Sequence, residues 1–460
     1  YGTMSNLVFG SNGLINSKVV QVNQLYQPDK NNFGPRVGFA YSPERFKDNL
    51  VVRGGFGVSY NRIENYLFEN TRGNPPFFAR YQICCGTSAQ DFSTPFANGQ
   101  ILYALGANSS PFSYPRNPAL ATGINPVTGA PNSGSVEIYG ALPKEPTPYV
   151  YTYSLEGEYS LPHKLTATVG YQGSASRKLM RLVNQNFLFP NNPSFFAVYF
   201  PTPDVTASFN SLNLHLGRRF SNGFKFDAIY RWSKSIDELS NEGPGAVTNQ
   251  TYPQDLKQER GPSDFDVRHN FVGSGLWELP FFRHRKDFAG KALGGFQLSS
   301  IVTWHTGFPW TPLQGACNTN PSRSAVCPIR PNGYKGGALT DTSNDAFIRP
   351  KGNFPNGGAS YFVLGDQTPG ILPGIGRNSF RGPRYFDVDM SLSKRTGVPK
   401  FFGEGAYFEF KVNTFNLFNN LNLQSFSFGA SNTIVTDPNF GRSFGGLSGR
   451  VVELQGRFSF

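Results

Sequence analysis

Charged residues are scarce in this 460-residue sequence, because Asp, Glu, Lys and Arg together make up only 16% of it. Ordinary soluble domains carry about 25%. Long hydrophobic runs are missing too: no stretch of about 18 apolar residues occurs, which excludes a transmembrane helix. A helical bundle or coiled coil is also excluded, because it needs a composition rich in Ala, Leu, Glu and Lys.

Glycine, proline and aromatic residues are abundant instead, with 51 Gly, 35 Pro, 44 Phe and 21 Tyr. Intrinsically disordered chains lack aromatic residues, so this chain is expected to fold. Glycine and proline interrupt regular structure, and aromatic residues favour strands. The composition therefore predicts many short strands joined by many loops.

Only four cysteines and five histidines are present. Cys84 and Cys85 are adjacent, and their pairing is left open. Cys317 and Cys327 could close a small loop disulfide in an oxidising compartment. No histidine lies near either cysteine pair, so neither a zinc site nor another metal site or cofactor is predicted.

The net charge is +12, yet the Lys and Arg residues are scattered along the chain. The one cluster is at residues 283–286, with the sequence Arg-His-Arg-Lys. Scattered charge argues against a nucleic-acid partner. A solvated surface is the preferred interpretation, and the alternative is attraction to outer-membrane lipid or lipopolysaccharide.

Alternation of apolar and polar residues, which indicates β-strands, recurs along the whole chain. Between residues 224 and 233, for example, Phe and Tyr alternate with Lys, Asp and Arg. Eleven segments follow this pattern: 35–41, 51–60, 149–160, 164–174, 207–220, 224–236, 266–279, 295–307, 384–395, 405–418 and 448–460.

The connections between these segments alternate strictly between short and long, and 61–148 and 308–383 are the longest. Outer-membrane barrels have short periplasmic turns and longer extracellular loops. We therefore predict an all-β fold, an antiparallel transmembrane β-barrel with about 11–12 strands in this chain. The alternative is a large soluble β-fold with one wet face. Residues 1–34 are expected outside the cell, with a weak twelfth strand at 17–26.

A barrel in lipid needs an apolar outer face, whereas its lumen face can be polar. Eight polar residues on the alternating strands are therefore predicted to face the lumen: Glu156, Glu158, Asp227, Arg231, Asp387, Asp389, Glu409 and Lys411. Aromatic residues near strand ends are predicted to form interfacial girdles: Tyr149, Tyr230, Trp232, Trp277, Trp304, Phe308 and Trp310.

Several segments resemble strands of Oar-like TonB-dependent outer-membrane receptors. The similar stretches are NFGPRVGFAY at 32–41, VVRGGFG at 51–57, RGPSDFDVRHNF at 260–271, GPRYFDVDMSLSK at 382–394 and FKVNTFNLFN at 410–419. The ending LQGRFSF at 454–460 resembles the C-terminal signal read by the outer-membrane assembly machinery, with Leu454, Phe458 and Phe460 as its apolar positions.

The resemblance implies that this chain is the C-terminal half, residues 35–460, of a probable 22-stranded barrel. A regulatory domain, a plug and a TonB box would precede Tyr1, and the inner-membrane TonB-type complex would be the partner that supplies energy. The implied function is energy-coupled uptake of a large or scarce substrate.

No catalytic constellation stands out, so no enzymatic activity is predicted. The densest polar cluster comprises Asp264, Asp266, Arg268 and His269. An acid/base or metal site is one interpretation, and a strand entry with ion pairs and turn caps is the favoured one. Asp387 and Asp389 are expected to pair with Lys411 or to contact a passing substrate.

The two longest loops carry aromatic residues and asparagine, for example Tyr81, Phe92, Phe112, Tyr114, Phe347 and Tyr361. Such a composition suits a carbohydrate or peptide ligand and equally suits a loop that packs on itself. Two functional alternatives stay open beside the receptor. One is a passive porin or surface adhesin barrel of about 12 strands, and the other is a secreted β-rich lectin or enzyme.

Overall fold

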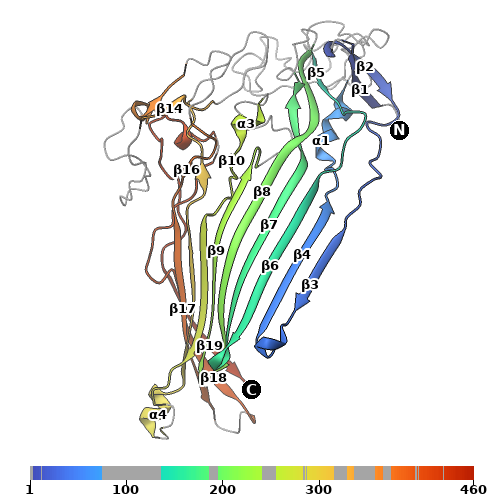
Figure 1. Ribbon diagram of the computed structural model, residues 1–460. Helices are drawn as coiled ribbons and strands as arrows, with labels where there is room; N and C mark the ends of the chain where they lie inside the picture. Colours follow the sequence, from blue (N-terminus) through green and yellow to red (C-terminus); the bar gives the residue numbers. More distant parts are fainter. Residues whose placement is uncertain are drawn as a thin grey trace.

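The computed structural model describes most of the chain (Figure 1). The described residues are 4–11, 13–74, 136–185, 195–240, 255–282, 285, 287–314, 329–335, 358–365, 375–398, 401, 403–427 and 429–460. Among them, no helix is both long and apolar enough to cross a bilayer. The four cysteines lie outside the described residues, so the predicted Cys317–Cys327 disulfide stays a prediction.

Eleven strands form the antiparallel path of one curved sheet, each paired with its neighbour, and two short strands pair with it off this path. In chain order the eleven are β3 (Arg36–Tyr41), β4 (Leu50–Tyr60), β6 (Tyr149–Leu161), β7 (Leu165–Asn184), β8 (Phe195–Ser221), β9 (Phe224–Asp237), β11 (His269–Glu278), β12 (Phe296–His305), β17 (Tyr385–Gly397), β18 (Tyr407–Phe415) and β19 (Val451–Ser459). These strands overlap all eleven predicted segments. β3 and β19 are the two edges of the sheet, which is open as described.

The short connections all lie at one end of the sheet, and the long ones lie at the other (Figure 1). We call these the short-turn end and the long-loop end. The alternation expected from the sequence is therefore confirmed as a geometric fact. At the short-turn end, η1 (Glu44–Phe46) and η4 (Pro162–Lys164) fill two turns, and α4 (Phe288–Leu293) fills a third.

The prediction of a loop between residues 174 and 207 is wrong, because β7 and β8 continue through most of this segment. Their pairing has register shifts between Ser176 and Leu179 and between Leu179 and Arg181. A bulge displaces the side-chain alternation, so the period of two is lost in sequence although the strands continue. Inside the extension the guanidinium of Arg181 binds Asp204 through two bonds of 2.7 Å.

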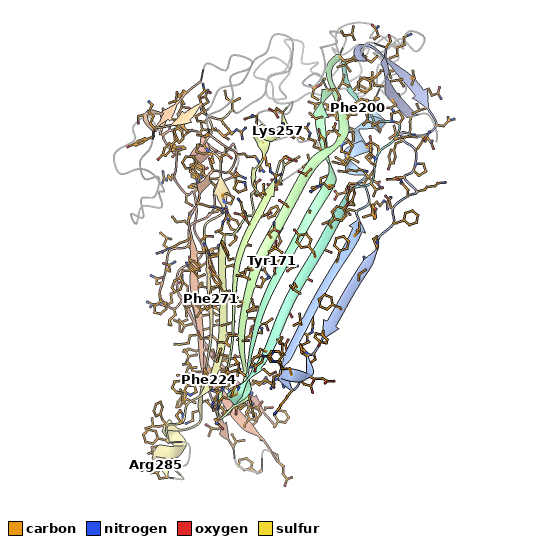
Figure 2. All side chains as sticks on the ribbon, in the orientation of Figure 1. Tyr171, Phe200, Phe224, Lys257, Phe271 and Arg285 are labelled. Atoms are coloured by element: carbon orange, nitrogen blue, oxygen red, sulfur yellow. The ribbon has the colours of Figure 1, made fainter. Side chains whose placement is uncertain are left out.

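The predicted twelfth strand at 17–26 is not part of this sheet. β2 (Gly13–Val22) instead pairs with β1 (Met4–Gly10) in a separate hairpin at the long-loop end. Apolar side chains explain this position. Leu7, Leu14 and Val19 pack into a buried cluster with Ile138, Phe195, Val198 and Phe200, the last labelled in Figure 2. The hairpin therefore has a core of its own.

Further short elements build the long-loop end. α1 (Tyr66–Glu69), η2 (Asn70–Gly73) and β5 (Val136–Tyr139) lie beside the hairpin, and β5 pairs with β8 in parallel. On the opposite side are α3 (Leu256–Glu259), β10 (Gly261–Pro262), β13 (Pro309–Trp310), β14 (Gly333–Tyr334), η6 (Ala359–Tyr361), β15 (Phe362–Val363), β16 (Phe380–Arg381) and η8 (Ser431–Thr433).

Another apolar cluster joins β13, β14, η6, β15 and β16, and it corrects one girdle prediction. Trp310 is 3% exposed and packs with Phe362, Ile375, Val435 and Phe440. It is therefore not at a lipid interface. Sequence alternation cannot reveal this, because the cluster joins segments from distant loops.

Candidate functional site

One face of the eleven-stranded sheet is polar and carries all eight residues predicted to face a lumen. Glu156 lies opposite Gly170, Gly170 opposite Asn213, and Asn213 opposite Arg231. Residues directly opposite one another share a face of a sheet. The same tracing and the period of two place Glu158, Asp227, Asp387, Asp389, Glu409 and Lys411 on this face.

The other face is apolar and largely exposed. Its exposed large side chains include Val37, Phe39, Phe56, Leu155, Val169, Tyr171, Leu214, Leu216, Trp232, Trp277, Phe408, Phe410, Val452, Leu454 and Phe458. So many exposed apolar side chains on one continuous surface mark an interaction surface rather than a wet face. The pattern is the one expected of a face that contacts lipid.

The polar face surrounds a cavity of about 880 Å³. Its lining comes from β6 to β9, β11, β12, β17 and β18, and it includes Glu158, His215, Asp227, Asp389 and Asn413. The walls therefore carry carboxylate, imidazole and amide groups side by side.

Ion pairs and a hydrogen bond between neighbouring strands organise this face. Arg53 on β4 lies 3.4 Å from Glu156 and 3.0 Å from Glu158 on β6. His215 Nε2 lies 2.7 Å from Asp227 Oδ2. These side chains are one third or more exposed, and exposed pairs contribute little to stability. Their main effect is a surface of mixed charge.

The predicted pairing of Asp387 and Asp389 with Lys411 is not formed. Lys411 lies opposite Ser393, and Asp389 is four residues further along the same strand. Asp389 instead accepts a bond of 3.0 Å from the backbone N–H of Asn416. Asp387 accepts one from the Tyr385 hydroxyl at 3.3 Å.

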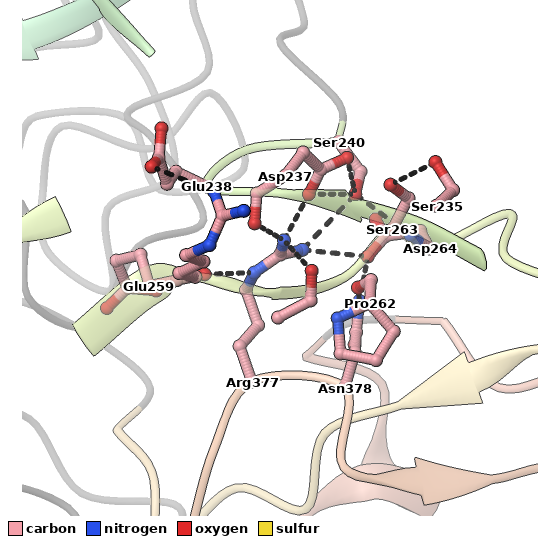
Figure 3. Close-up of polar contacts among 12 residues, drawn as sticks. Ser235, Asp237, Glu238, Ser240, Glu259, Pro262, Ser263, Asp264, Arg377 and Asn378 are labelled. Carbon is pink, nitrogen blue, oxygen red and sulfur yellow. Dashed lines mark hydrogen bonds and ion pairs between the residues drawn. The ribbon is translucent and has the colours of Figure 1, made fainter. Parts of the chain in front are cut away.

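A buried arginine, which sequence reasoning missed, fixes the long-loop end (Figure 3). Arg377 donates to the carbonyl oxygens of Asp237 at 2.8 Å and of Glu259 at 2.7 Å. It also forms ion pairs with the carboxylates of Asp237 and Asp264. One side chain thereby joins the β12–β17 connection to the β9–β11 connection. No motif marks these partners, because they are more than 110 residues apart.

The predicted polar cluster at 264–269 makes the contacts that its structural interpretation requires. Asp266 accepts a bond of 2.6 Å from the backbone N–H of Ser235 and pairs with Arg381. His269 Nδ1 lies 2.7 Å from the Tyr230 hydroxyl. Within the described part of the chain, no three His, Cys, Asp or Glu residues lie together as metal ligands would. The cluster thus joins strand ends.

At the long-loop end, three asparagine side chains hydrogen-bond to the backbone N–H and C=O of another residue, as a neighbouring strand would. Asn422 accepts from the Phe386 N–H at 2.9 Å and donates to its carbonyl at 3.0 Å. Asn6 does the same with Ala141, at 2.9 Å for both bonds, and Asn74 bridges Tyr139 in the same way. These amides are used inside the protein, as a loop that packs on itself would use them.

The aromatic loop residues considered for ligand binding fall mostly outside the described residues. Tyr81, Phe92, Phe112, Tyr114 and Phe347 are among those not described. Tyr361 is described, and it packs against the cluster of Trp310 and Phe362. For this residue the self-packing interpretation holds.

Glu145 is a titratable group buried in the segment before β6. Its Oε1 accepts a bond of 2.7 Å from the backbone N–H of Leu142. Oε2 is buried and has no hydrogen-bond partner within the described structure. Burial raises the pKa of this carboxyl to about 7, although the bond from Leu142 acts in the opposite direction.

The C-terminal residues lie on the edge strand β19. Leu454 and Phe458 point to the apolar face, and the ring of Phe458 lies 6.0 Å from that of Phe460. Phe460 is 91% exposed. The three predicted signal positions therefore have exposed side chains on or directly after the edge strand β19, which pairs with β18.

Comparison with known families gives one match that spans almost the entire chain. A family model described as "Outer membrane beta barrel domain" matches residues 1–453. Comparison with curated protein sequences finds no match.

Solved structures show similarity at low sequence identity. The outer membrane transporter YddB from Escherichia coli has 10% identity and a TM-score of 0.45, covering 96% of this chain and 42% of that one. The pyoverdine receptor FpvA from Pseudomonas aeruginosa PAO1 has 10% identity and a TM-score of 0.43, with coverages of 96% and 38%. The siderophore receptor PiuA from Acinetobacter baumannii has 8% identity and a TM-score of 0.40, with coverages of 97% and 37%. This chain spans well under half the length of each.

Proposed function

The chain belongs to the outer membrane beta barrel domain family, and from this premise we propose that it is the C-terminal half of the barrel of a TonB-dependent receptor. Membership of the family places it in the cell outer membrane. In the proposed function the long-loop end binds a large or scarce solute. An inner-membrane TonB-type complex supplies the energy for its uptake through an N-terminal plug.

The observation that carries the proposal is the open sheet of eleven strands. In lipid, every backbone N–H and C=O must be satisfied within the protein, so the edges at β3 and β19 need further strands. Bacterial single-chain barrels also have even strand numbers. A barrel of about 22 strands would contain this sheet as one half, and barrels of that size enclose a plug.

The alternating connections give the proposed orientation. The short-turn end faces the periplasm, and the long-loop end faces outward. The apolar face then contacts lipid, and the polar face lines the lumen. Glu156, Glu158, Asp227, Arg231, Asp387, Asp389, Glu409 and Lys411 would contact a solute or a plug.

The structured long-loop end supports a receptor over a passive pore. The Arg377 network and two of the apolar clusters hold the described segments of the long-loop end together. A binding surface that is ordered beforehand loses less entropy on binding. The twelve-stranded alternative lacks its extra strand, because β2 pairs with β1 outside the sheet. The absence of catalysis and the Oar-like subgroup stay predictions.

Solute uptake by intact cells tests the proposal directly. Cells that express the full-length protein should take up an oligosaccharide or peptide substrate only when the TonB complex is functional. A matched strain with the chain deleted should lose the same uptake. Uptake that continues without TonB would instead support a passive porin, and surface attachment without uptake would support an adhesin.

The C-terminal edge strand fits the proposed interaction with the assembly machinery. Leu454, Phe458 and Phe460 have exposed apolar side chains on or directly after β19, the strand at one edge of the sheet. An edge strand can pair with a further strand through its backbone. We expect the machinery to pair with β19 before the barrel closes.

A further inference from the structure

The connection between β11 and β12, residues 279–295, is an unusual member of the short-turn end. We call its described residues, 279–282, 285 and 287–295, the foot. It contains α4 and projects beyond the end of the sheet (Figure 1). Four of its large apolar side chains are exposed: Phe281 by 59%, Phe282 by 40%, Phe288 by 86% and Leu293 by 55%. Large apolar side chains gathered on one exposed turn indicate a surface that contacts something other than water.

The apolar surface of the foot continues the apolar face of the sheet. The Phe281 ring meets the Trp277 ring edge-on, with centroids 6.5 Å apart. Trp277 lies opposite Phe224 on β9 and Leu298 on β12, so it belongs to the apolar face. Figure 2 shows Arg285 of the foot beyond Phe224, at the same end of the molecule. The foot therefore begins where the lipid-facing surface ends.

Cationic side chains lie over aromatic rings around this junction. Arg218 on β8 stands 5.5 Å from the Phe224 ring, and Lys394 on β17 stands 4.8 Å from the Phe296 ring. Both belong to the apolar face, because Arg218 lies opposite Phe226 and Lys394 opposite Phe296. Among the acyl chains such charges would be costly. At the depth of the headgroups, long basic side chains can reach the lipid phosphates.

The foot itself adds a third cation. Arg285 lies 5.8 Å from the Phe282 ring and pairs with Asp287, which also caps α4 through the Gly290 N–H. Both charged side chains stay about half exposed, so this pair does not remove Arg285 from its surroundings. Arg283, His284 and Lys286 of the same basic run lie outside the described residues, and the inference does not use them.

We propose that the foot, together with Arg218 and Lys394, binds anionic glycerophospholipids of the leaflet at the short-turn end. Aromatic side chains beside cations are the combination that settles at an anionic lipid interface. Lipopolysaccharide is not the partner, because the short turns face the opposite leaflet. The inference rests on the outer-membrane barrel and on its proposed orientation, and it is independent of the proposed transport.

Lipid binding by the purified full-length protein tests the charged part. The protein is reconstituted in phosphatidylcholine vesicles with or without phosphatidylglycerol, and lipid retained after detergent exchange is measured by native mass spectrometry. We expect preferential retention of phosphatidylglycerol. Arg218→Gln and Lys394→Gln should each lower that preference about fivefold, since one basic residue near a membrane surface contributes about that factor.

A matched control lies on the neighbouring strand. Lys225 adjoins Phe224 on β9 but points to the polar face, so Lys225→Gln should leave the lipid preference unchanged. Heat-modifiable migration of every variant shows that the barrel has folded. No preference for phosphatidylglycerol in the unaltered protein, or an equal loss in all three variants, would overturn the proposal.

The apolar part is tested with Phe288→Trp. Its added emission, obtained by subtracting the unaltered protein, should be shifted to the blue and quenched by brominated phospholipids. Emission typical of water would place the foot in the periplasm. Blue-shifted emission without quenching would mean that protein covers it, whether an N-terminal segment of the chain or a periplasmic partner. Either result would refute a lipid-binding foot.

Discussion

Arg377 and Asp237 lie 140 positions apart in the sequence, yet the guanidinium binds both the carbonyl and the carboxylate of Asp237. Both side chains are almost fully buried. The contact joins the β12–β17 connection to the end of β9 (Figure 3). This enclosed pair holds the two described segments together, because loss of Arg377 would leave the buried carboxylate of Asp237 without a cation.

Replacing this arginine should destabilise the long-loop end strongly. Arg377→Ala leaves the buried carboxylate of Asp237 unpaired, and we expect a loss of about 3–5 kcal/mol in the free energy of unfolding. Thermal unfolding in detergent measures it. Arg384→Ala removes an exposed arginine seven positions further on and should change stability little. Equal stability of the two variants would show that the Arg377 contacts do not stabilise the long-loop end.

Asn422 should tolerate no apolar replacement. Asn422→Leu leaves the partly buried N–H of Phe386 without its acceptor and removes one of two donors to the Phe386 carbonyl, because Asn420 also donates to that carbonyl at 3.2 Å. We expect a cost of about 1 kcal/mol. Faster amide exchange at the start of β17 should accompany the loss. The control is Asn31→Ala, because the Asn31 side chain is exposed. Unchanged exchange at Phe386 in the Asn422 variant would contradict the role assigned to this amide.

Glu145 should make stability depend on pH. Its pKa in the folded state is raised to about 7, above the usual 4.5, so the folded protein binds this proton more tightly than the unfolded chain. Its contribution is therefore favourable at low pH and is lost as the pH rises from about 4.5 to 7, by up to roughly 3 kcal/mol. Unfolding measured between pH 5 and 8 should show this fall.

The Glu145→Gln variant isolates this effect. It keeps an acceptor for the Leu142 N–H and removes the ionisation, so its stability should vary less with pH and exceed that of the unaltered protein at pH 8. Parallel pH profiles for the two proteins would show that Glu145 does not titrate in this range.

Changing the last residue should impair assembly of the barrel. Phe460→Asp places a charge at an exposed aromatic end that we expect the assembly machinery to recognise. The amount of folded, heat-modifiable protein in the outer membrane should fall severalfold. Phe444→Asp, at another exposed phenylalanine, should assemble normally. Normal surface levels of the Phe460 variant would exclude a terminal signal.

Cys317 and Cys327 are expected to be oxidised to a disulfide. Alkylation under denaturing, non-reducing conditions, followed by peptide mass mapping, measures their free thiols. A linked peptide pair supports the loop disulfide. Two alkylated cysteines would refute it.

Alternation of side chains allowed the strands to be predicted closely. Ten of the eleven described strands begin within three residues of the expected start; β8 begins twelve residues early, because the bulges near Leu179 disturb the period of two where the strands continue. Trp310 was misplaced for a different reason. Its apolar surroundings come from Phe362, Val435 and Phe440, and no local pattern brings these together.

The polar face was also predictable, because a strand in a barrel wall exposes one face to lipid and the other to the lumen. The partners of individual polar groups were not. Lys411 was expected near Asp389, but the register places it opposite Ser393. The register between two strands decides which side chains meet. The sequence of a single strand does not specify that register.

The sequence by itself determined the eleven strands, their two faces and the order of short and long connections. These features follow from local alternation, since neighbouring side chains on a strand must meet different surroundings. Only the tertiary structure decided that Arg377 reaches Asp237, that β2 leaves the sheet for a core with Phe200, and that Phe281 extends the apolar face at Trp277. Each of these depends on contacts between segments that meet only after the chain has folded.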